Sequence, residues 1–89
     1  MPDVEIYTSA LCGYCTMAKR LLERKGVEFE EWNVSFKPGL RREMMARTEG
    51  RYTTPQIFIG EQGVGGCDEL YDLESSGELD RLLGRASSS

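Results

Sequence analysis

Cys12 and Cys15, separated by Gly13 and Tyr14, lie where a strand pattern changes into a helix pattern. Residues 4–8 alternate in polarity as a half-buried strand does, and apolar residues at helical spacing follow the second cysteine. This arrangement predicts that Cys12 lies at the N-terminal edge of a helix, with Cys15 one turn further along. Unpaired backbone N–H groups and the positive end of the helix dipole stabilise a thiolate at such an edge. We therefore expect the pKa of Cys12 to lie between roughly 3.5 and 7.5, as in activated cysteines, below that of a free thiol.

The rest of the composition excludes most other kinds of catalytic chemistry and leaves thiol chemistry as the main candidate. The 89 residues include no histidine, which excludes histidine acid–base catalysis, Cys–His pairs and histidine-ligated metals. Three cysteines are too few for a tetrahedral zinc site made of thiolates, so no metal site is expected. We interpret the spaced thiols as a redox centre in which Cys12 is the nucleophile and Cys15 resolves what Cys12 captures. Spacing alone leaves open that Cys15 is an inert core thiol.

Length, charge and cysteine count indicate the number of domains, the kind of partner and the cellular compartment to expect. A chain of 89 residues is expected to form one domain, which we place at residues 1–85, with a disordered tail at residues 86–89. The net charge of −4 argues against general nucleic-acid binding. Neither a signal peptide nor a membrane span is expected, because no basic cluster precedes an apolar run and no apolar stretch is long enough. An odd number of cysteines fits a disulfide-stabilised secreted scaffold badly, and we expect a cytoplasmic protein.

The pattern of the whole chain predicts an α/β fold. Strands are expected at residues 4–8, 28–33 and 56–59 and near Val64, with helices ending at Gly26, Gly50 and Gly77 and a last turn after that. A helix between the first two strands makes them parallel, whereas the short turn at residues 60–62 predicts an antiparallel hairpin. A mixed four-stranded sheet in this order, flanked by helices on both faces, is the thioredoxin fold. The cysteine pair follows the carboxyl end of the first strand, where α/β folds bind ligands.

The second helix is expected to combine a buried stripe with a basic surface. Leu40, Met44 and Met45 have the spacing of a buried stripe. Between residues 37 and 51, five cations face only two carboxylates, although the protein as a whole is acidic. An anionic small molecule could therefore bind there.

Several motifs, in the right order and at the right distances, resemble those of the glutaredoxin family. They are Val4-Glu5-Ile6-Tyr7-Thr8, Cys12-Gly13-Tyr14-Cys15, Thr53-Thr54-Pro55-Gln56-Ile57-Phe58 and Gly65-Gly66-Cys67-Asp68-Glu69-Leu70. The resemblance covers nearly the whole chain. It implies a glutathione-dependent thiol–disulfide oxidoreductase, with glutathione as reducing co-substrate and glutathionylated or disulfide-containing proteins as partners. It also implies a monomer.

The resemblance assigns the segment around Pro55 to glutathione binding. It implies a cis peptide before Pro55, which leaves the backbone of Thr54 free to pair, like a strand, with the cysteinyl residue of glutathione. Tyr14 would form an aromatic wall beside the sulfur. Simpler interpretations are a trans proline that starts a strand and a surface tyrosine in a loop.

Two further parts of the chain would bind the ends of glutathione. Gly66, Cys67 and Asp68 would receive the γ-glutamyl end at the start of a helix. Arg42 aligns with the position that meets the glycine carboxylate in this family. Alternatively, Asp68 is only a helix cap and Arg42 a solvated charge. Cys67 is interpreted as a half-buried neighbour of the site rather than a catalyst.

The sequence departs from the family pattern at two positions. Many relatives have lysine where this chain has Ser9, so stabilisation of a Cys12 thiolate would depend more on the helix terminus. Many have proline where this chain has Gly13. Proteins of this family that lack the proline can hold a [2Fe–2S] cluster between two monomers, with Cys12 of each chain and two glutathione thiolates as ligands. A cluster-binding dimer is therefore the alternative function.

Overall fold

A computed structural model of the chain describes residues 2–84, so the end of the predicted domain and the predicted tail at residues 86–89 lie outside it. The elements, in chain order, are β1 (Val4–Thr8), α1 (Gly13–Arg24), β2 (Glu30–Asn33), α2 (Pro38–Arg47), β3 (Gln56–Ile59), β4 (Gln62–Gly65), α3 (Cys67–Ser76) and α4 (Glu78–Leu82). The predicted order of strands and helices is confirmed. No helix in the described part of the chain is long and apolar enough to cross a membrane.

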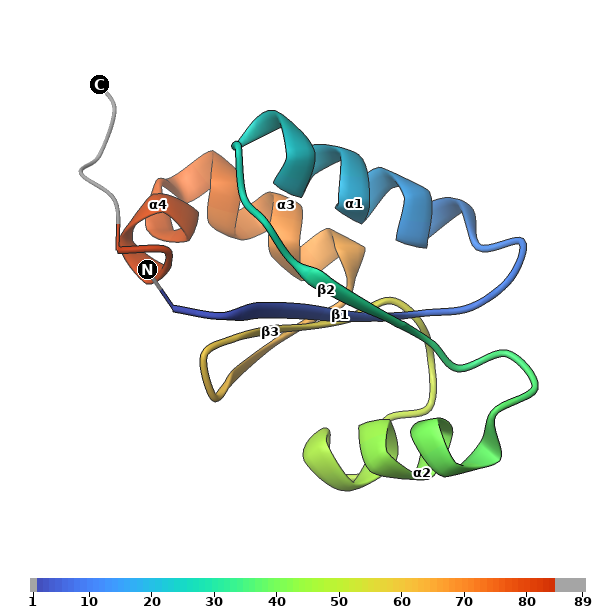
Figure 1. Cartoon of the computed structure of the whole chain (residues 1–89). Coiled ribbons are helices and arrows are strands. Elements are labelled where there is room, and N and C mark those ends of the chain that lie inside the picture. The colour runs from blue at the N-terminus through green and yellow to red at the C-terminus, as the bar shows by residue number, and fades with distance from the viewer. Residues whose placement is uncertain (1, 85–89) are drawn as a thin grey trace.

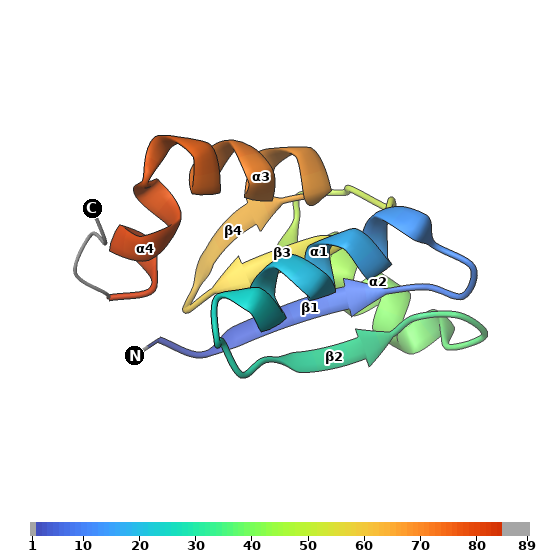
Figure 2. The ribbon, with the colours of Figure 1, turned by 90° about the horizontal axis from the view of Figure 1, so that it is seen from above.

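The strands form one mixed sheet in the order β2-β1-β3-β4 (Figure 2). β1 and β2 are parallel because α1 carries the chain back across the sheet between them. β3 runs antiparallel to both β1 and β4, and the tight turn at Gly60 joins β3 to β4 as the predicted hairpin. The predicted thioredoxin arrangement is confirmed.

Helices cover both faces of the sheet (Figure 1). α1 and α3 lie on one face, where Ile6, Leu22, Ile57 and Leu70 belong to the larger core cluster. α2 lies on the other face, below the sheet in Figure 1, and packs against a smaller cluster that includes Tyr7. Neighbouring residues of β1 point to opposite faces, so one strand contributes to both clusters.

The second helix differs from its sequence-based description. Only Met44 is fully buried, whereas Leu40 and Met45 are partly exposed. The helix ends at Arg47 rather than at Gly50. At its end the Met44 carbonyl accepts both the backbone N–H of Thr48, at 3.0 Å, and the Thr48 hydroxyl, at 2.8 Å. A short helix with one buried side chain needs another attachment to the sheet.

Arg47 supplies that attachment. Its guanidinium donates to both carboxylate oxygens of Glu5, at 3.2 and 3.0 Å, and to the Tyr7 hydroxyl at 2.9 Å. It also stacks over the Phe58 ring, 3.9 Å from the centroid. The hydrogen bonds from Arg47 hold the pKa of the Glu5 carboxyl below its ordinary value. One side chain thus joins α2 to β1, the strand that leads to the cysteine pair, and to β3.

Candidate active site

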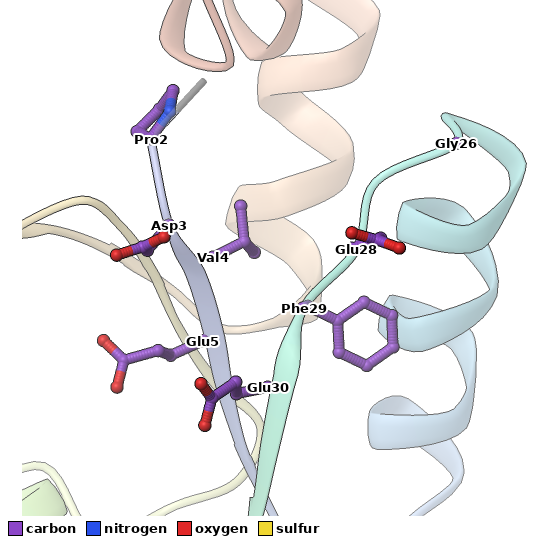
Figure 3. A pocket seen from close by; sticks show the side chains of 8 residues that line it. All are labelled: Pro2, Asp3, Val4, Glu5, Gly26, Glu28, Phe29 and Glu30. Carbon is purple, nitrogen blue, oxygen red and sulfur yellow. The ribbon is translucent and has the colours of Figure 1, made fainter.

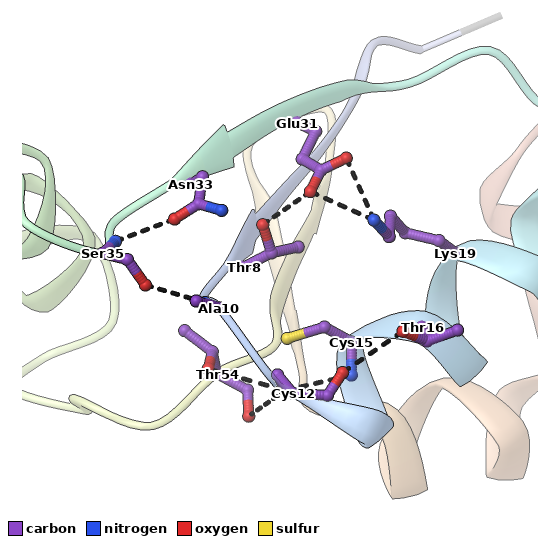
Figure 4. Close-up of polar contacts among 10 residues, drawn as sticks. All are labelled: Thr8, Ala10, Cys12, Cys15, Thr16, Lys19, Glu31, Asn33, Ser35 and Thr54. Carbon is purple, nitrogen blue, oxygen red and sulfur yellow. Dashed lines mark hydrogen bonds and ion pairs between the residues drawn. The ribbon is translucent and has the colours of Figure 1, made fainter.

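Cys12 is the N-cap residue of α1. Its backbone is extended (φ −103°, ψ 103°), and its Sγ accepts a hydrogen bond from the backbone N–H of Cys15 at 3.1 Å (Figure 4). This is the geometry of an N-cap side chain that satisfies one of the free N–H groups of the first turn. Cys12 is half-buried, whereas Cys15 and Cys67 are buried, so Cys12 is the most accessible of the three thiol residues. The predicted position of Cys12 at the helix edge is confirmed.

Thr54 lies close to the sulfur of Cys12, although the two residues are 42 positions apart in the chain. The Thr54 carbonyl oxygen and its hydroxyl Oγ1 each lie 3.8 Å from Cys12 Sγ. The Thr54–Pro55 peptide is cis, as the family resemblance implied. The Ser9 hydroxyl lies 2.6 Å from the Thr54 hydroxyl, so a chain of two hydroxyl groups leads to the sulfur.

The surroundings of the two cysteines move their pKa values in opposite directions. Burial raises the pKa of Cys12, but hydrogen bonds from the thiol and backbone N–H of Cys15 and from the Thr54 and Ser9 hydroxyls outweigh it. The net pKa of the Cys12 thiol therefore lies below its ordinary value. Burial, and next the hydrogen bond to Cys12, raise the pKa of Cys15 to about 11. At neutral pH Cys15 keeps its proton and can share it with a Cys12 thiolate.

A hollow of about 160 Å³ is lined by most of the residues that the resemblance assigned to glutathione, among them Thr54, which lies 3.8 Å from Cys12 Sγ. Its lining includes Tyr14, Thr54 and Pro55 on one side and Gly66, Cys67 and Asp68 on the other. Arg42, on α2, is not part of this lining. Arg51 is, and it pairs with Glu69 at 3.5 Å.

The comparisons with known proteins agree with this geometry. A family model described as glutaredoxin matches residues 4–64. The chain belongs to the glutaredoxin family. A glutaredoxin of Pseudomonas aeruginosa is 58% identical over 83 residues, which cover 93% of this chain and 98% of that protein. Glutaredoxin 3 of Escherichia coli K12 is 52% identical, over 93% of this chain and 99% of that protein.

A solved structure gives the same result for the fold. The solution structure of glutaredoxin from Brucella melitensis matches with a TM-score of 0.81 at 55% identity, covering 97% of this chain and 95% of that one. Glutaredoxins are thiol–disulfide oxidoreductases, and glutathione dependence is a property of the family. The Cys-x-x-Cys pair lies at the N-terminus of α1, and its position is consistent with a redox motif.

Cys67 is the third thiol of this glutaredoxin. It is 5% exposed, and burial followed by the nearby Asp68 carboxylate raises its pKa. Cys67 is therefore buried rather than half-buried as expected. A protonated, buried thiol is a poor nucleophile, which agrees with the expectation that Cys67 is not a catalyst. Asp68, one residue further along, is exposed in the first turn of α3.

Reasoning from the sequence did not assign Gln56 to the site, but Gln56 is one of the residues that line the hollow. Gln56 is buried, and its side-chain amide donates to the Thr53 carbonyl and hydroxyl at 3.0 and 3.3 Å. It thereby holds the loop that carries Thr54. The available signal was a polar residue inside an apolar strand, because a buried amide requires hydrogen-bond partners.

Two other hollows lie outside this lining. One, of about 420 Å³, borders Cys12 on the side of β2, where the Glu31 carboxylate accepts from the Thr8 hydroxyl at 2.7 Å and pairs with Lys19 (Figure 4). The other, of about 690 Å³, lies at the far end of β1 (Figure 3). Its described lining brings together Asp3, Glu5, Glu28 and Glu30 but includes no cysteine.

Ser9 takes part in the electrostatics of the glutaredoxin thiol, although the sequence suggested only a missing lysine. Ser9→Ala removes the hydroxyl that orients Thr54, so we expect the pKa of Cys12 to rise. Alkylation of Cys12 at pH 6 should slow by about two- to tenfold, the effect of one lost hydrogen bond. Ser9→Lys should lower the pKa instead, because a cation favours the thiolate.

Ser9→Thr is the matched control, since it keeps a hydroxyl at the same position. The pH dependence of iodoacetamide labelling, followed by mass spectrometry, gives the midpoint for each variant. An unchanged midpoint in Ser9→Ala would show that the helix terminus and Cys15 act without Ser9.

Proposed function

We propose that Cys12 is the catalytic nucleophile of this glutaredoxin and Cys15 its resolving thiol. The observation that carries the proposal is the hydrogen bond from the Cys15 backbone N–H to Cys12 Sγ, because it favours the thiolate at the accessible sulfur. The Cys12 thiolate attacks the glutathione sulfur of a mixed disulfide. A new disulfide joins Cys12 to glutathione, and the protein thiolate leaves and takes a proton.

A second glutathione thiolate then attacks the glutathione sulfur bound to Cys12. Glutathione disulfide forms, and the Cys12 thiolate is released. Turnover of hydroxyethyl glutathione disulfide in the presence of glutathione tests this proposal. Absence of turnover in the reduced protein would overturn it.

For protein disulfides we propose that Cys15 completes the reaction. Cys12 first attacks one sulfur of the disulfide and remains bound to it, while the second protein sulfur leaves as a thiolate. Cys15 then attacks Cys12 Sγ and closes the intramolecular disulfide, and the protein sulfur that was bound to Cys12 leaves as a thiolate and takes a proton. Once the Cys12 charge is lost in a disulfide, its hydrogen bond with Cys15 no longer holds the proton on Cys15. Cys15 is thus easier to ionise at the step that needs its thiolate.

We further propose that the hollow beside Tyr14 receives glutathione. Its cysteinyl residue pairs with the backbone of Thr54 beside Pro55. Its γ-glutamyl end meets Gly66, Cys67 and Asp68, where the N-terminus of α3 offers N–H groups and the aspartate a carboxylate for the ammonium group. The lining of the hollow by these residues supports the proposal.

The glycine carboxylate of glutathione needs a cation, and Arg42 and Arg51 are the candidates. Arg42 is the choice that the resemblance implies, and Arg51 lines the hollow. Arg42→Glu and Arg51→Glu should each raise KM for glutathione several-fold, up to about tenfold, with little change in kcat, because they weaken ground-state binding. Steady-state kinetics with varied glutathione measures both constants.

Arg24→Glu, an exposed change at the far end of α1, is the matched control for net charge. If only Arg51→Glu raises KM, the carboxylate binds beside the hollow and not at α2. If neither substitution raises KM, the proposed orientation of glutathione is wrong.

Gly13 supports a second candidate function, a [2Fe–2S] dimer. Among the described residues no three Cys, Asp or Glu side chains gather as a metal site. A cluster would therefore require Cys12 of two chains and two glutathione thiolates. A Cβ built at Gly13 meets nothing within 4 Å, so packing does not explain the glycine. Glycine keeps a backbone N–H that proline lacks and that can donate to cluster sulfur.

We expect a minority brown dimer when iron, sulfide and glutathione are supplied without oxygen, beside a colourless monomer. Gly13→Pro should suppress the visible absorbance and the dimer while sparing oxidoreductase turnover. Absorbance spectra combined with size-exclusion chromatography measure both. A wild-type protein that stays colourless and monomeric eliminates this candidate.

The physiological setting that we propose is the reducing cytoplasm, with the monomer as the working form. The three cysteines are free thiols in the structure, which suits a compartment that keeps thiols reduced. Glutathione and proteins with glutathionylated or disulfide-bonded cysteines are the proposed partners.

A further inference from the structure

Leu11 and Phe36 are the most exposed large apolar side chains among residues 2–84. Leu11 is 106% exposed and Phe36 is 100% exposed, so neither side chain packs against the rest of the protein. Leu11 lies in the loop between β1 and α1, and Phe36 lies in the loop between β2 and α2. Both have a left-handed backbone, with φ of 57° and 60°, which is unusual for side chains of this size.

Hydrogen bonds join these two loops. The backbone N–H of Ala10 donates to the Ser35 hydroxyl at 2.7 Å, and the Ser35 N–H donates to the Asn33 side chain at 2.9 Å (Figure 4). β1 and β2 are parallel, so both loops leave the sheet at its carboxyl end, the end that carries Cys12 (Figures 1 and 2). The residues next to Ala10 and Ser35 are Leu11 and Phe36. They are thus held at the same edge of the molecule as the reactive sulfur.

Leu11 is also continuous with the redox site. It precedes Cys12 in the chain and lines the hollow of about 420 Å³ that borders Cys12 on the side of β2. The hollow with the proposed glutathione residues has a different lining, which includes Tyr14 and Asp68. When Cys12 attacks a protein disulfide, a protein sulfur bonds to Cys12 at about 2 Å. When it attacks a glutathionylated protein, the leaving protein sulfur lies in line just beyond the glutathione sulfur. In both reactions the protein side of the substrate comes close to Cys12 and to the side chains that surround it, which include Leu11.

We propose that Leu11 and Phe36 form a docking surface for the protein side of the substrate. The partner is a protein with apolar side chains beside its glutathionylated or disulfide-bonded cysteine. This inference rests on the proposed function of Cys12. Both side chains are exposed to water in the free protein. When apolar side chains of the partner cover them, this apolar surface is removed from water, which favours binding.

Two glutathionylated peptides test the proposal: one with leucine and phenylalanine beside the modified cysteine, and one with serine at both positions. The variants are Leu11→Asn and Phe36→Asn, because asparagine tolerates a left-handed backbone and the fold is kept. Each should lower kcat/KM for the apolar peptide by roughly tenfold, toward the value for the serine peptide. Turnover of hydroxyethyl glutathione disulfide should stay at the wild-type level.

Met17→Asn is the matched control, since Met17 is an exposed apolar residue on α1 that lines neither hollow beside Cys12. It should leave the preference for the apolar peptide intact. Equal turnover of both peptides by the wild-type protein would overturn the docking surface. An equal loss of turnover of hydroxyethyl glutathione disulfide in Leu11→Asn and Phe36→Asn would also overturn it, because such a loss would indicate an effect on Cys12 itself.

Sedimentation of the wild-type protein over a range of concentrations tests another occupant. A dimer that Leu11→Asn and Phe36→Asn abolish would assign the surface to a second copy of the chain and overturn the proposal. Failure of the proposed function is distinguishable, because the wild-type protein would then not turn over hydroxyethyl glutathione disulfide at all.

Discussion

Cys12→Ser should abolish the reduction of both glutathione mixed disulfides and protein disulfides, by a factor on the order of 10⁴ or more. The reason is that Cys12 Sγ is the accessible sulfur, the N-cap of α1 and the acceptor of the Cys15 N–H. Neither remaining thiol can replace it, because Cys15 is 2% exposed and Cys67 is 5% exposed, and the pKa of each is raised. Coupled turnover assays with each substrate class measure the loss.

Cys15→Ser separates the two reactions. It should keep much of the turnover of glutathione mixed disulfides, for which a second glutathione suffices, and lose the reduction of protein disulfides. Cys67→Ser is the matched control and should keep both. If Cys15→Ser were as inactive as Cys12→Ser toward a glutathione mixed disulfide, the assignment of nucleophile and resolving thiol would be wrong.

One thiol per chain should react rapidly with iodoacetamide at neutral pH. A pKa of about 11 for Cys15 leaves only roughly one molecule in ten thousand with a Cys15 thiolate at pH 7. The lowered pKa of Cys12 increases the fraction of its reactive thiolate, which persists as the pH falls toward that pKa. The labelling rate should therefore level off above the Cys12 pKa and fall about tenfold per pH unit below it.

Mass spectrometry of peptides from the labelled protein identifies the modified cysteine, and the rate against pH gives the midpoint. Cys12→Ser should remove the rapid phase, while Cys67→Ser should leave it unchanged. A midpoint at or above that of a free thiol, ~8.5, would contradict the stabilisation of the thiolate by the helix terminus. Rapid labelling of Cys15 would contradict its burial.

The sequence alone was sufficient to predict the elements that depend on local patterns. Alternation in residues 4–8 and helical spacing after Cys15 located β1 and α1, and with them Cys12 at the helix edge. The length of chain between two strands decided parallel or antiparallel pairing. These predictions held because strand and helix periods, helix termini and tight turns involve residues that are close together in the chain. The predicted end of α2 at Gly50 was wrong, since the backbone leaves the helical conformation at Thr48 and is left-handed at Glu49.

Only the tertiary structure decided which side chains meet in the site. The Ser9 and Thr54 hydroxyls that lead to Cys12 are separated by 45 positions, and no local pattern connects them. The sequence could list Arg42 and Arg51 as cations, but the packing of the loop after α2 places Arg51 in the lining of the hollow. The same holds for Arg47, whose attachment of α2 depends on the register of β1 and β3. Contacts of this kind arise from the packing of elements that are distant in the chain, whereas the chemistry of the Cys12–Cys15 pair follows from two thiols and the start of one helix.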